Sequence, residues 1–298
     1  MIGDVLNIFN ELKNSDFRIL TGIELGMRNR EWVPVPEILQ YTNMSVEKLI
    51  YRLDWLRRKK LVVRTYQPYE GYRIYFEGYD ALALNAYVRR GTFDSIGVEI
   101  GVGKESVVLE VQKKPTLPIS SPETYILKLH REGQTSFKQV KRTRDHISGK
   151  EHISWIYASR LAAQREFEIM KELWPEISIP KPIDCNRHTI VMEIAKGNEL
   201  YKSKLEEPNW HLDLILKEIQ KIYSHGIIHA DLSEYNIFVS EEGIQIIDWP
   251  QYVSYLHPNA DELLKRDVSN ILSYFSRKYG IIKDINEVLN FVRGEINK

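Results

Sequence analysis

One polar turn in the chain has side chains that could carry out phosphoryl transfer. Asp231 and Asn236 lie five residues apart in this turn, and apolar runs flank it on both sides. Transfer of a phosphoryl group to a hydroxyl needs a carboxylate that positions the nucleophile and accepts its proton. It also needs an amide oxygen that can hold Mg²⁺ against the phosphates. Asp231 and Asn236 match these two roles, so residues 227–238 are the strongest functional signal in the sequence.

A second carboxylate follows at the end of the next apolar strand, predicted over residues 244–247. This residue is Asp248. Carboxylate oxygens are preferred ligands of Mg²⁺, and one carboxylate commonly joins the amide oxygen in holding the metal. We therefore expect Asp248 to be the main Mg²⁺ ligand.

Lys128 lies inside an apolar strand predicted over residues 125–130. A buried ammonium group is costly unless an anion accompanies it. Glu166, in an amphipathic helix over residues 161–170, is a candidate partner. We expect an ion pair, but two unrelated surface charges would also fit the sequence.

Two glycines, Gly101 and Gly103, interrupt alternating apolar residues over 96–109. The pattern predicts a strand, a tight turn and a second strand that could cover phosphates. An ordinary turn explains it equally well, and the Walker A spacing is not met. The segment gains meaning only from the residues that follow it.

Residues 1–90 have the pattern of a winged helix. Helices are predicted at 4–12 and 16–26, and Pro34 and Pro36 begin a third. Ser45 caps a further helix over 46–60, strands follow at 61–64 and 72–76, and a connecting helix over 80–90 is closed by Gly91. The order of helix, turn, helix and hairpin predicts the winged helix.

The outward face of the helix over 46–60 could contact nucleic acid. Residues 1–90 carry 14 basic and 11 acidic side chains, whereas the whole chain has 41 of each. Basic and aromatic residues together suit phosphates and bases. The residues assigned to this face are Lys48, Tyr51, Arg52, Trp55, Arg58 and Lys59. Winged helices also dock proteins, so a protein partner stays open.

Composition favours a soluble cytoplasmic protein with no membrane partner. Cys185 is the one cysteine, which excludes an intramolecular disulfide. No apolar stretch approaches the roughly 18 residues that span a bilayer. Residues 135–150 are polar and predict a long flexible loop.

Taken together, these motifs resemble the RIO protein kinases. The similarity covers nearly the whole chain and is closest in the string His229-Ala-Asp-Leu-Ser-Glu-Tyr-Asn236. Residues 103–106 (Gly-Lys-Glu-Ser), 248–251 (Asp-Trp-Pro-Gln) and 257–260 (His-Pro-Asn-Ala) resemble the second, winged-helix-containing branch. The implied fold is α+β, with a winged helix at 1–90 and a bilobal kinase-like domain at 91–298. The implied N-lobe covers 91–191, the hinge 192–197 and the C-lobe 198–298.

The resemblance also assigns residues. It implies that Asp231 is the catalytic aspartate, that Asn236 and Asp248 bind metal, and that Lys128 contacts phosphates while paired with Glu166. Met192, Glu193 and Ile194 would be the hinge that hydrogen-bonds adenine. The other implied nucleotide contacts are Gly101, Gly103, Lys104, Glu105, Ser106, Val108 and Ile247.

The implied activity is that of an ATP-dependent atypical serine/threonine protein kinase that uses Mg²⁺, or Mn²⁺ in its place. The implied role is late maturation of the small ribosomal subunit, with rRNA and ribosomal or assembly proteins as partners and with autophosphorylation on serine. Ser106 stands in place of the third glycine of ordinary protein kinases and Ala230 in place of their arginine, and no Ala-Pro-Glu segment follows Asp248. ATP use is therefore the firmer expectation, and ATP hydrolysis through phosphorylation of Asp248 is a further hypothesis.

Two other functions stay open. A small-molecule phosphotransferase, such as an aminoglycoside or choline kinase, would share the Asp and Asn pattern, but the winged helix and the short chain after Asp248 disfavour it. A nucleotide-sensing scaffold without activity is disfavoured because Lys128, Asp231, Asn236 and Asp248 are all present.

Overall fold

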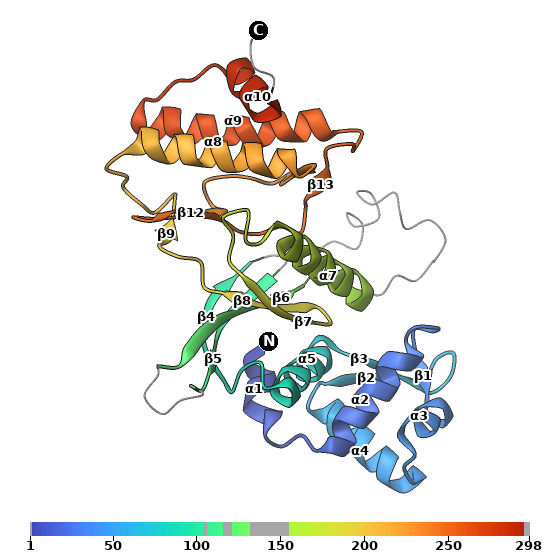
Figure 1. Ribbon diagram of the computed structural model, residues 1–298. Helices are drawn as coiled ribbons and strands as arrows, with labels where there is room; N and C mark the ends of the chain where they lie inside the picture. Colours follow the sequence, from blue (N-terminus) through green and yellow to red (C-terminus); the bar gives the residue numbers. More distant parts are fainter. Residues whose placement is uncertain (1, 104–105, 116–120, 132–154, 295–298) are drawn as a thin grey trace. The chain divides into compact units, whose positions relative to one another are not determined.

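The computed structural model describes residues 2–103, 106–115, 121–131 and 155–294. The chain divides into two compact units. The first contains residues 1–123, 128–161 and 186–189, and the second contains residues 124–127, 162–185 and 190–298. Both mix helices and strands (Figure 1), which confirms the α+β prediction.

A winged helix forms the beginning of the first unit. Its helices are α1 (Ile2–Phe9), α2 (Asn14–Gly26), α3 (Val35–Thr42), α4 (Val46–Arg58) and α5 (Phe76–Arg90). Its strands are β1 (Val33–Pro34), β2 (Val62–Thr65) and β3 (Gly71–Ile74), in the order β1-β3-β2. One apolar core joins these elements, because residues at helical spacing on α2 and α4, such as Ile19 and Leu53, are fully buried.

Local sequence signals set most of these boundaries. The Ser45 hydroxyl accepts the N–H of Lys48, so this residue caps α4 as predicted. Gly91 ends α5 in the left-handed conformation, also as predicted. The second wing strand was predicted to continue to Phe76, which is wrong, because α5 begins there. Gly78 allows this early start, since a Cβ at that position would lie 2.2 Å from the carbonyl oxygen of Leu61.

Arg52 does not lie on the outward face of α4, so its assignment to a nucleic-acid surface is wrong. Its side chain is buried and forms a two-pronged ion pair with Asp16 of α2, which is fully buried. The Asp16 carboxylate also accepts the N–H of Lys13 at 2.8 Å. A carboxylate on a neighbouring helix has turned this arginine inward, which no pattern within α4 could reveal.

The glycine-rich segment is a strand hairpin, as predicted. Strands β4 (Ser95–Val102) and β5 (Ser106–Lys113) pair antiparallel, with Gly101 opposite Val108. Together with β6 (Glu123–His130), β7 (Pro182–Asn186) and β8 (Thr189–Glu193) they form a sheet in the order β4-β5-β6-β8-β7. Helix α7 (Trp155–Leu173) precedes β7 in the chain. The predicted loop over 135–150 lies outside the described residues.

The second unit is mainly helical. Its helices are α8 (Pro208–Ser224), α9 (Ala260–Tyr279) and α10 (Ile285–Arg293). Two small sheets have the orders β12-β11-β9 and β10-β13. Their strands are β9 (Asn198–Glu199), β10 (Ile227–Ile228), β11 (Ile237–Ser240), β12 (Gly243–Ile246) and β13 (Val253–Ser254). A core around Trp249 and Phe275, both fully buried, joins the sheets to α8 and α9.

In the part of the chain that the structure describes, no helix combines the length and the apolar character that crossing a bilayer requires.

We predict that Asp16→Asn destabilises the protein by about 3–5 kcal/mol, because it leaves the buried Arg52 charge without a full partner. Urea unfolding followed by tryptophan fluorescence would measure this loss. Asp54→Asn is the matched control, since Asp54 pairs with Arg57 and Arg58 at the surface. If the two variants lost equal stability, burial would not be the source of the effect.

Candidate active site

Asp231 and Asn236 lie in one loop of the second unit. The loop, residues 229–236, connects β10 to β11. The side-chain amide of Asn236 donates from Nδ2 to the main-chain carbonyl of Asp231 at 2.8 Å. This bond orients the amide, so Oδ1 is the atom with which Asn236 would contact a cation. Asp231 is exposed at the loop surface.

The residues just before Asp248 are bonded to the same loop. The N–H of Ile247 donates to the carbonyl of Asn236 at 2.9 Å. The carbonyl of Ile247 accepts from Nε2 of His229 at 3.0 Å, so the His229 ring carries its proton on Nε2. Asp248 itself has a left-handed backbone with φ of 71°, which Asp tolerates better than most residues. The two predicted metal ligands are thus joined through the backbone.

Glu166 of α7 contacts the residue that follows Asp248. Its Oε1 atom accepts the main-chain N–H of Trp249 at 3.1 Å, and both residues are almost completely buried. The predicted partner Lys128 belongs to the other compact unit, so the ion pair between them stays a prediction. The contact of Glu166 with Trp249 is one that the sequence did not indicate.

The side chain of Asp267 in α9 accepts two hydrogen bonds from the backbone of the 229–236 loop. Its Oδ2 accepts the N–H of Ala230 at 2.7 Å, and its Oδ1 accepts the N–H of Leu232 at 3.0 Å. The neighbouring Arg266 donates to the carbonyl of Ala230. Ala230 has φ of 64°, a left-handed conformation that costs a residue with a Cβ about 1–2 kcal/mol. These three hydrogen bonds stabilise that strained conformation.

Burial raises the pKa of the Asp267 carboxyl to about 6, although the N–H groups of Leu232 and Ala230 and the charge of Arg266 act in the opposite direction. The carboxylate form accepts both N–H groups, whereas a protonated carboxyl has one weaker acceptor. The state of Asp267 therefore affects how firmly the loop beside Asp231 is held.

The donor set suits Mg²⁺ better than a metal that needs a complete protein cage. Asn236 and Asp248 supply an amide and a carboxylate oxygen from adjoining segments. Among the described residues, no three His, Cys, Asp or Glu side chains form a metal-binding group. Mg²⁺ is commonly bound by one or two carboxylates together with substrate phosphates. These residues fit the ion that the sequence predicts.

The predicted phosphate-contacting residues lie in the first unit. Lys128 in β6 is buried, as the apolar strand predicted. Gly103 donates its N–H to the carbonyl of Ser106 at 2.8 Å and closes the hairpin, while Val108 pairs with Gly101. A Cβ built on Gly101 would meet no atom of the described residues within 4 Å. Lys104 and Glu105 lie outside the described residues.

One main-chain N–H group of the predicted hinge already donates a hydrogen bond within the protein. The N–H of Glu193, at the end of β8, donates to the carbonyl of Lys181 at 2.9 Å. Met192 is buried and Ile194 is exposed. The carbonyl of Glu193 and the N–H of Ile194 are therefore the groups we expect to face adenine.

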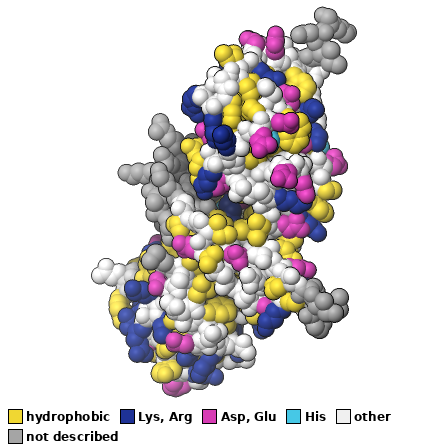
Figure 2. Space-filling view, turned by 90° about the vertical axis from the view of Figure 1, so that its left-hand side faces the viewer, with side chains coloured by type: hydrophobic (Ala, Val, Ile, Leu, Met, Phe, Trp, Pro, Cys, Tyr) yellow, Lys and Arg dark blue, Asp and Glu magenta, His cyan; other side chains and the backbone are white. Residues whose placement is uncertain are grey.

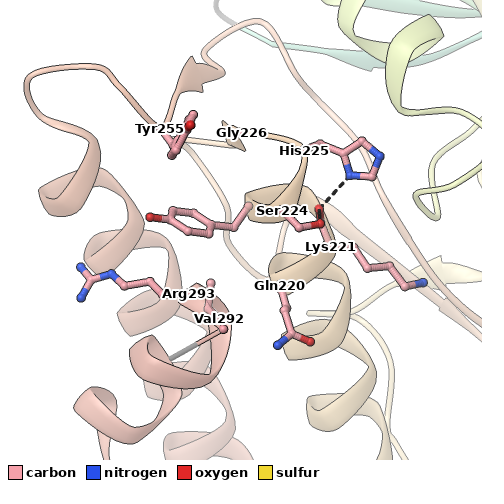
Figure 3. A pocket seen from close by; sticks show the side chains of 10 residues that line it. Gln220, Lys221, Ser224, His225, Gly226, Tyr255, Val292 and Arg293 are labelled. Atoms are coloured by element: carbon pink, nitrogen blue, oxygen red, sulfur yellow. Dashed lines mark hydrogen bonds between the residues drawn. The ribbon is translucent and has the colours of Figure 1, made fainter. Parts of the chain in front are cut away.

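A cavity of about 650 Å³ in the second unit is separate from these residues. It lies at the C-terminal ends of α8 and α10, where Lys221, His225, Tyr255 and Arg293 line it (Figure 3). None of the predicted site residues that the structure describes lines this cavity. Its lysine and arginine side chains are paired with carboxylates, Lys221 with Glu218 at 2.6 Å and Arg293 with Asp261 at 2.8 Å, so neither is available as an unpaired charge for an anion.

Sequence reasoning missed Asp267 and Arg266. One signal was present, because Asp267 lies on the apolar face of α9 at helical spacing from Leu264 and Ile271, both buried. A carboxylate at a core position needs donors. The signal says that Asp267 has a partner but does not say that the partner is the 229–236 loop.

Comparison with known proteins agrees with this geometry. The sequence matches the family model for the RIO domain over residues 108–288 and the model for the Rio2 N-terminal domain over residues 9–90. It is 42% identical over 279 residues to the RIO-type serine/threonine-protein kinase Rio2 of Methanocaldococcus jannaschii. The aligned region covers 89% of this chain and 99% of that protein. It is 39% identical to the serine/threonine-protein kinase rio2 of Dictyostelium discoideum over 91% of this chain, and it spans 51% of that longer relative.

A solved structure is similar over most of the chain. The crystal structure of the Rio2 kinase-ADP/Mg²⁺-phosphoaspartate complex from Chaetomium thermophilum superposes with a TM-score of 0.81 at 34% identity. The match covers 95% of this chain and 87% of that one. It confirms a winged helix followed by a kinase-like domain. The chain belongs to the RIO family of atypical serine/threonine protein kinases, in the branch that carries an N-terminal winged helix.

Proposed function

We propose that this RIO-type serine/threonine kinase uses Mg²⁺ and ATP, with Asp231 as the group that orients the attacking hydroxyl and accepts its proton. The observation that supports this most is the bonded arrangement of the 229–236 loop. Asn236 donates to the carbonyl of Asp231. Ile247, the residue before Asp248, donates its N–H to Asn236 and accepts from His229 through its carbonyl. Such fixed positioning is the main contribution that a protein makes to phosphoryl transfer.

In the proposed transfer, a serine hydroxyl oxygen forms the new bond to the γ-phosphorus. The bond from that phosphorus to the β–γ bridging oxygen breaks, ADP leaves, and the hydroxyl proton passes to Asp231. Asn236 Oδ1 and Asp248 would hold Mg²⁺, which neutralises charge on the phosphates. Lys128 would contact the phosphates, and residues 192–194 would bind adenine. The β4–β5 hairpin would cover the triphosphate.

A second candidate activity is ATP hydrolysis through phosphorylated Asp248. The related Chaetomium thermophilum structure is of a complex with ADP, Mg²⁺ and phosphoaspartate. In this chain an Asp248 carboxylate oxygen would attack the γ-phosphorus, ADP would leave, and water would later cleave the acyl phosphate. The backbone beside this carboxylate is left-handed at Asp248 and is held by the contact of Glu166 to the N–H of Trp249.

We propose further that the kinase acts in the cytoplasm in maturation of the small ribosomal subunit, and that the winged helix contacts rRNA. Lys and Arg side chains gather on one face of the winged helix (Figure 2). Without Arg52, the exposed candidates on α4 are Lys48, Tyr51 and Arg58. On the wing, the Arg64 guanidinium lies 4.4 Å from the ring of Tyr66, which is 68% exposed. An exposed aromatic ring suits unpaired bases, although the Arg64 guanidinium is partly buried and also pairs with Glu70 at 2.8 Å.

Incubation with γ-labelled ATP and Mg²⁺ tests the proposed activity. Both protein-bound label and released phosphate should appear with the wild type and fall about 10²–10⁴-fold in Asp231→Ala, while ATP binding is largely kept. Label that is acid-stable and hydroxylamine-labile, and that Asp248→Asn loses, would support the phosphoaspartate route. ATP binding without either product would indicate a nucleotide-sensing scaffold.

We predict that protonation of Asp267 causes kcat to decrease on the acidic side of the pH–activity profile. Below pH 6 the carboxyl is protonated and the 229–236 loop is held less firmly, so kcat should fall. The pKa of this group is higher in the folded protein than the roughly 3.9 of unfolded aspartate. The stability that it contributes is therefore greatest at low pH and decreases as pH rises through 6.

Measurement of kcat and of the melting temperature from pH 5 to 8 would separate the two effects. Asp267→Asn should have a low kcat at every pH, because an amide cannot accept both N–H groups as a carboxylate does. An unchanged acidic limb in Asp267→Asn would exclude Asp267 as its source.

We predict that Gly101→Val raises the KM for ATP about tenfold, equivalent to about 1.4 kcal/mol, without lowering stability. The chain leaves open space at this Cβ position, and valine suits a strand. Among the described residues nothing would meet the new side chain, whereas a ligand over the hairpin would. Val98→Thr is the control, since Val98 is 66% exposed on the same strand. Equal KM values for the two variants would argue that ATP does not approach Gly101.

We predict that RNA binding by the chain weakens in Lys48→Ala and Tyr51→Ala. Contacts to phosphates release counterions, so the wild-type affinity should fall steeply with salt, and Lys48→Ala should reduce that dependence. Titration of a labelled single-stranded RNA at several salt concentrations would measure both quantities. Binding that ignores salt and both substitutions would favour a protein partner for this face.

A further inference from the structure

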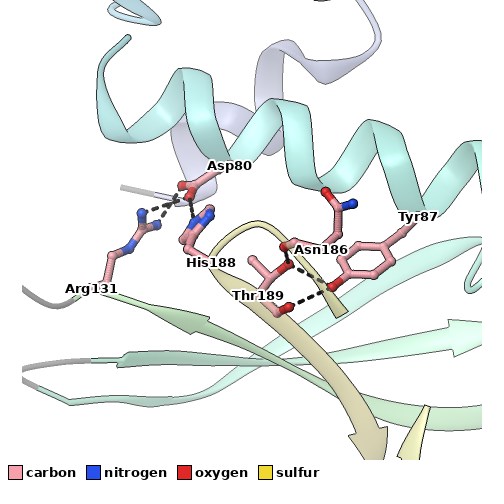
Figure 4. A network of polar contacts seen from close by, with 6 residues as sticks. All are labelled: Asp80, Tyr87, Arg131, Asn186, His188 and Thr189. Atoms are coloured by element: carbon pink, nitrogen blue, oxygen red, sulfur yellow. Dashed lines mark hydrogen bonds and ion pairs between the residues drawn. The ribbon is translucent and has the colours of Figure 1, made fainter. Parts of the chain in front are cut away.

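A buried carboxylate connects the winged helix to the strand that carries Lys128. Asp80 projects from α5 and is fully buried (Figure 4). Its Oδ1 accepts Nη1 of Arg131 at 2.8 Å, and its Oδ2 accepts Nη2 at 2.6 Å. Nε2 of His188 lies 2.8 Å from Oδ1. All three residues belong to the first compact unit.

The contacts around Asp80 and His188 indicate which of the two side chains is ionised. Burial alone would raise the pKa of the Asp80 carboxyl, but the Arg131 charge and the His188 hydrogen bond outweigh it, and the pKa lies below the ordinary value. Burial lowers the pKa of His188 despite Asp80. An ionised carboxylate only accepts, so neutral His188 donates through Nε2. Asp80 therefore holds two donors from two segments of the chain.

Those two segments are the end of β6 and the turn between β7 and β8. Arg131 directly follows β6, and the N–H of His130 donates to the carbonyl of His188 at 2.8 Å. The start of β8, just after this turn, also contacts α5, because the Tyr87 hydroxyl lies 2.8 Å from Oγ1 of Thr189. The end of β6 is thus fixed to α5 by side chains and to the turn by its backbone.

Lys128 lies in β6, three residues before Arg131. An extended strand rises about 3.3 Å per residue and has few soft torsions once it is hydrogen-bonded. Lys128 is itself buried, so its ammonium group has little freedom to compensate for a shift of the strand. A displacement of Arg131 would therefore reach Lys128.

We propose that Asp80 is a positioning residue for nucleotide binding, which fixes the end of β6 and so places Lys128 against the ATP phosphates. The inference rests on the proposed function of Lys128. It makes the last helix of the winged helix a part of the nucleotide-binding apparatus. A 1 Å misplacement of a catalytic group can cost about 10²-fold, so a shift of β6 should be measurable.

A purely structural role is the alternative, and the chain offers a matched control for it. Asp16 also forms a fully buried two-pronged ion pair, with Arg52, in the same unit. The Asp16 pair joins α2 to α4 and has no contact with β6 among those described. Asp80→Asn and Asp16→Asn should both lower the melting temperature, but only Asp80→Asn should alter ATP binding.

The test measures the Kd of Mg·ATP and steady-state kinetics for the full chain. We expect Asp80→Asn to raise the Kd and the KM at least about tenfold relative to Asp16→Asn. If Asp80→Asn does not fold, Asp80→Asn with Arg131→Gln replaces it, because that pair leaves no unpaired buried charge. In a Lys128→Met background the Asp80 substitution should have no further effect on the Kd, because the two act through one contact.

Equal Kd values for the Asp80 and Asp16 variants would overturn the inference, as would additive effects of Asp80→Asn and Lys128→Met. Failure of the proposed function gives a different result. In that case wild-type protein would not bind Mg·ATP, or Lys128→Met would bind it as tightly as wild type. Either result would remove the basis of the inference as well.

Discussion

The arrangement of the proposed catalytic residues depends on two hydrogen bonds, which the main-chain N–H groups of Ala230 and Leu232 donate to Asp267. Ala230 has a backbone conformation that a residue with a Cβ rarely adopts, and the carboxylate on one side and Arg266 on the other stabilise it. From this bend the chain passes through Asp231 to Asn236, and Asn236 in turn bonds the residue before Asp248. One buried carboxylate therefore supports the loop that connects the three proposed site residues.

Buried carboxylates organise the rest of the molecule in a similar way. Asp16 holds Arg52 inside the winged helix, Asp80 holds Arg131 and His188, and Glu166 holds the N–H of Trp249. Each removes a charge from water, which is costly, and each recovers that cost through directional hydrogen bonds. Apolar packing alone would allow the elements to slide, whereas these bonds specify one register between them. The two compact units each contain at least one such contact.

The sequence predicted the architecture because its signals are local. Helical spacing, the Ser45 cap, the Gly91 end and the wing hairpin each depend on residues that are neighbours in the chain. The turn proposed as catalytic was identified in the same way, since the chemistry expected of Asp231, Asn236 and Asp248 follows from residue type and order. The resemblance to RIO kinases then supplied roles for Lys128 and Glu166.

The errors and omissions concern contacts between distant segments. Arg52 looked exposed because the pattern of α4 contains no sign of Asp16, which lies 36 residues earlier. Phe76 looked like a strand residue because the close approach of Gly78 to Leu61 is a tertiary contact. Asp267 was visible as a carboxylate on an apolar helix face, but its partners lie 35 and 37 residues away. Pattern identifies that a buried charge needs a partner, and only the fold identifies which one.

A crystal structure of the chain with Mg²⁺ and a non-hydrolysable ATP analogue would test the assignment of the site most directly. We expect Asn236 Oδ1 and an Asp248 oxygen within about 2.0–2.1 Å of the metal. We expect Lys128 at the phosphates, adenine at residues 193–194, and Asp231 beside the γ-phosphate without binding the metal. Nucleotide bound elsewhere, for example in the cavity between α8 and α10, or a metal that Asn236 and Asp248 do not contact, would contradict the assignment.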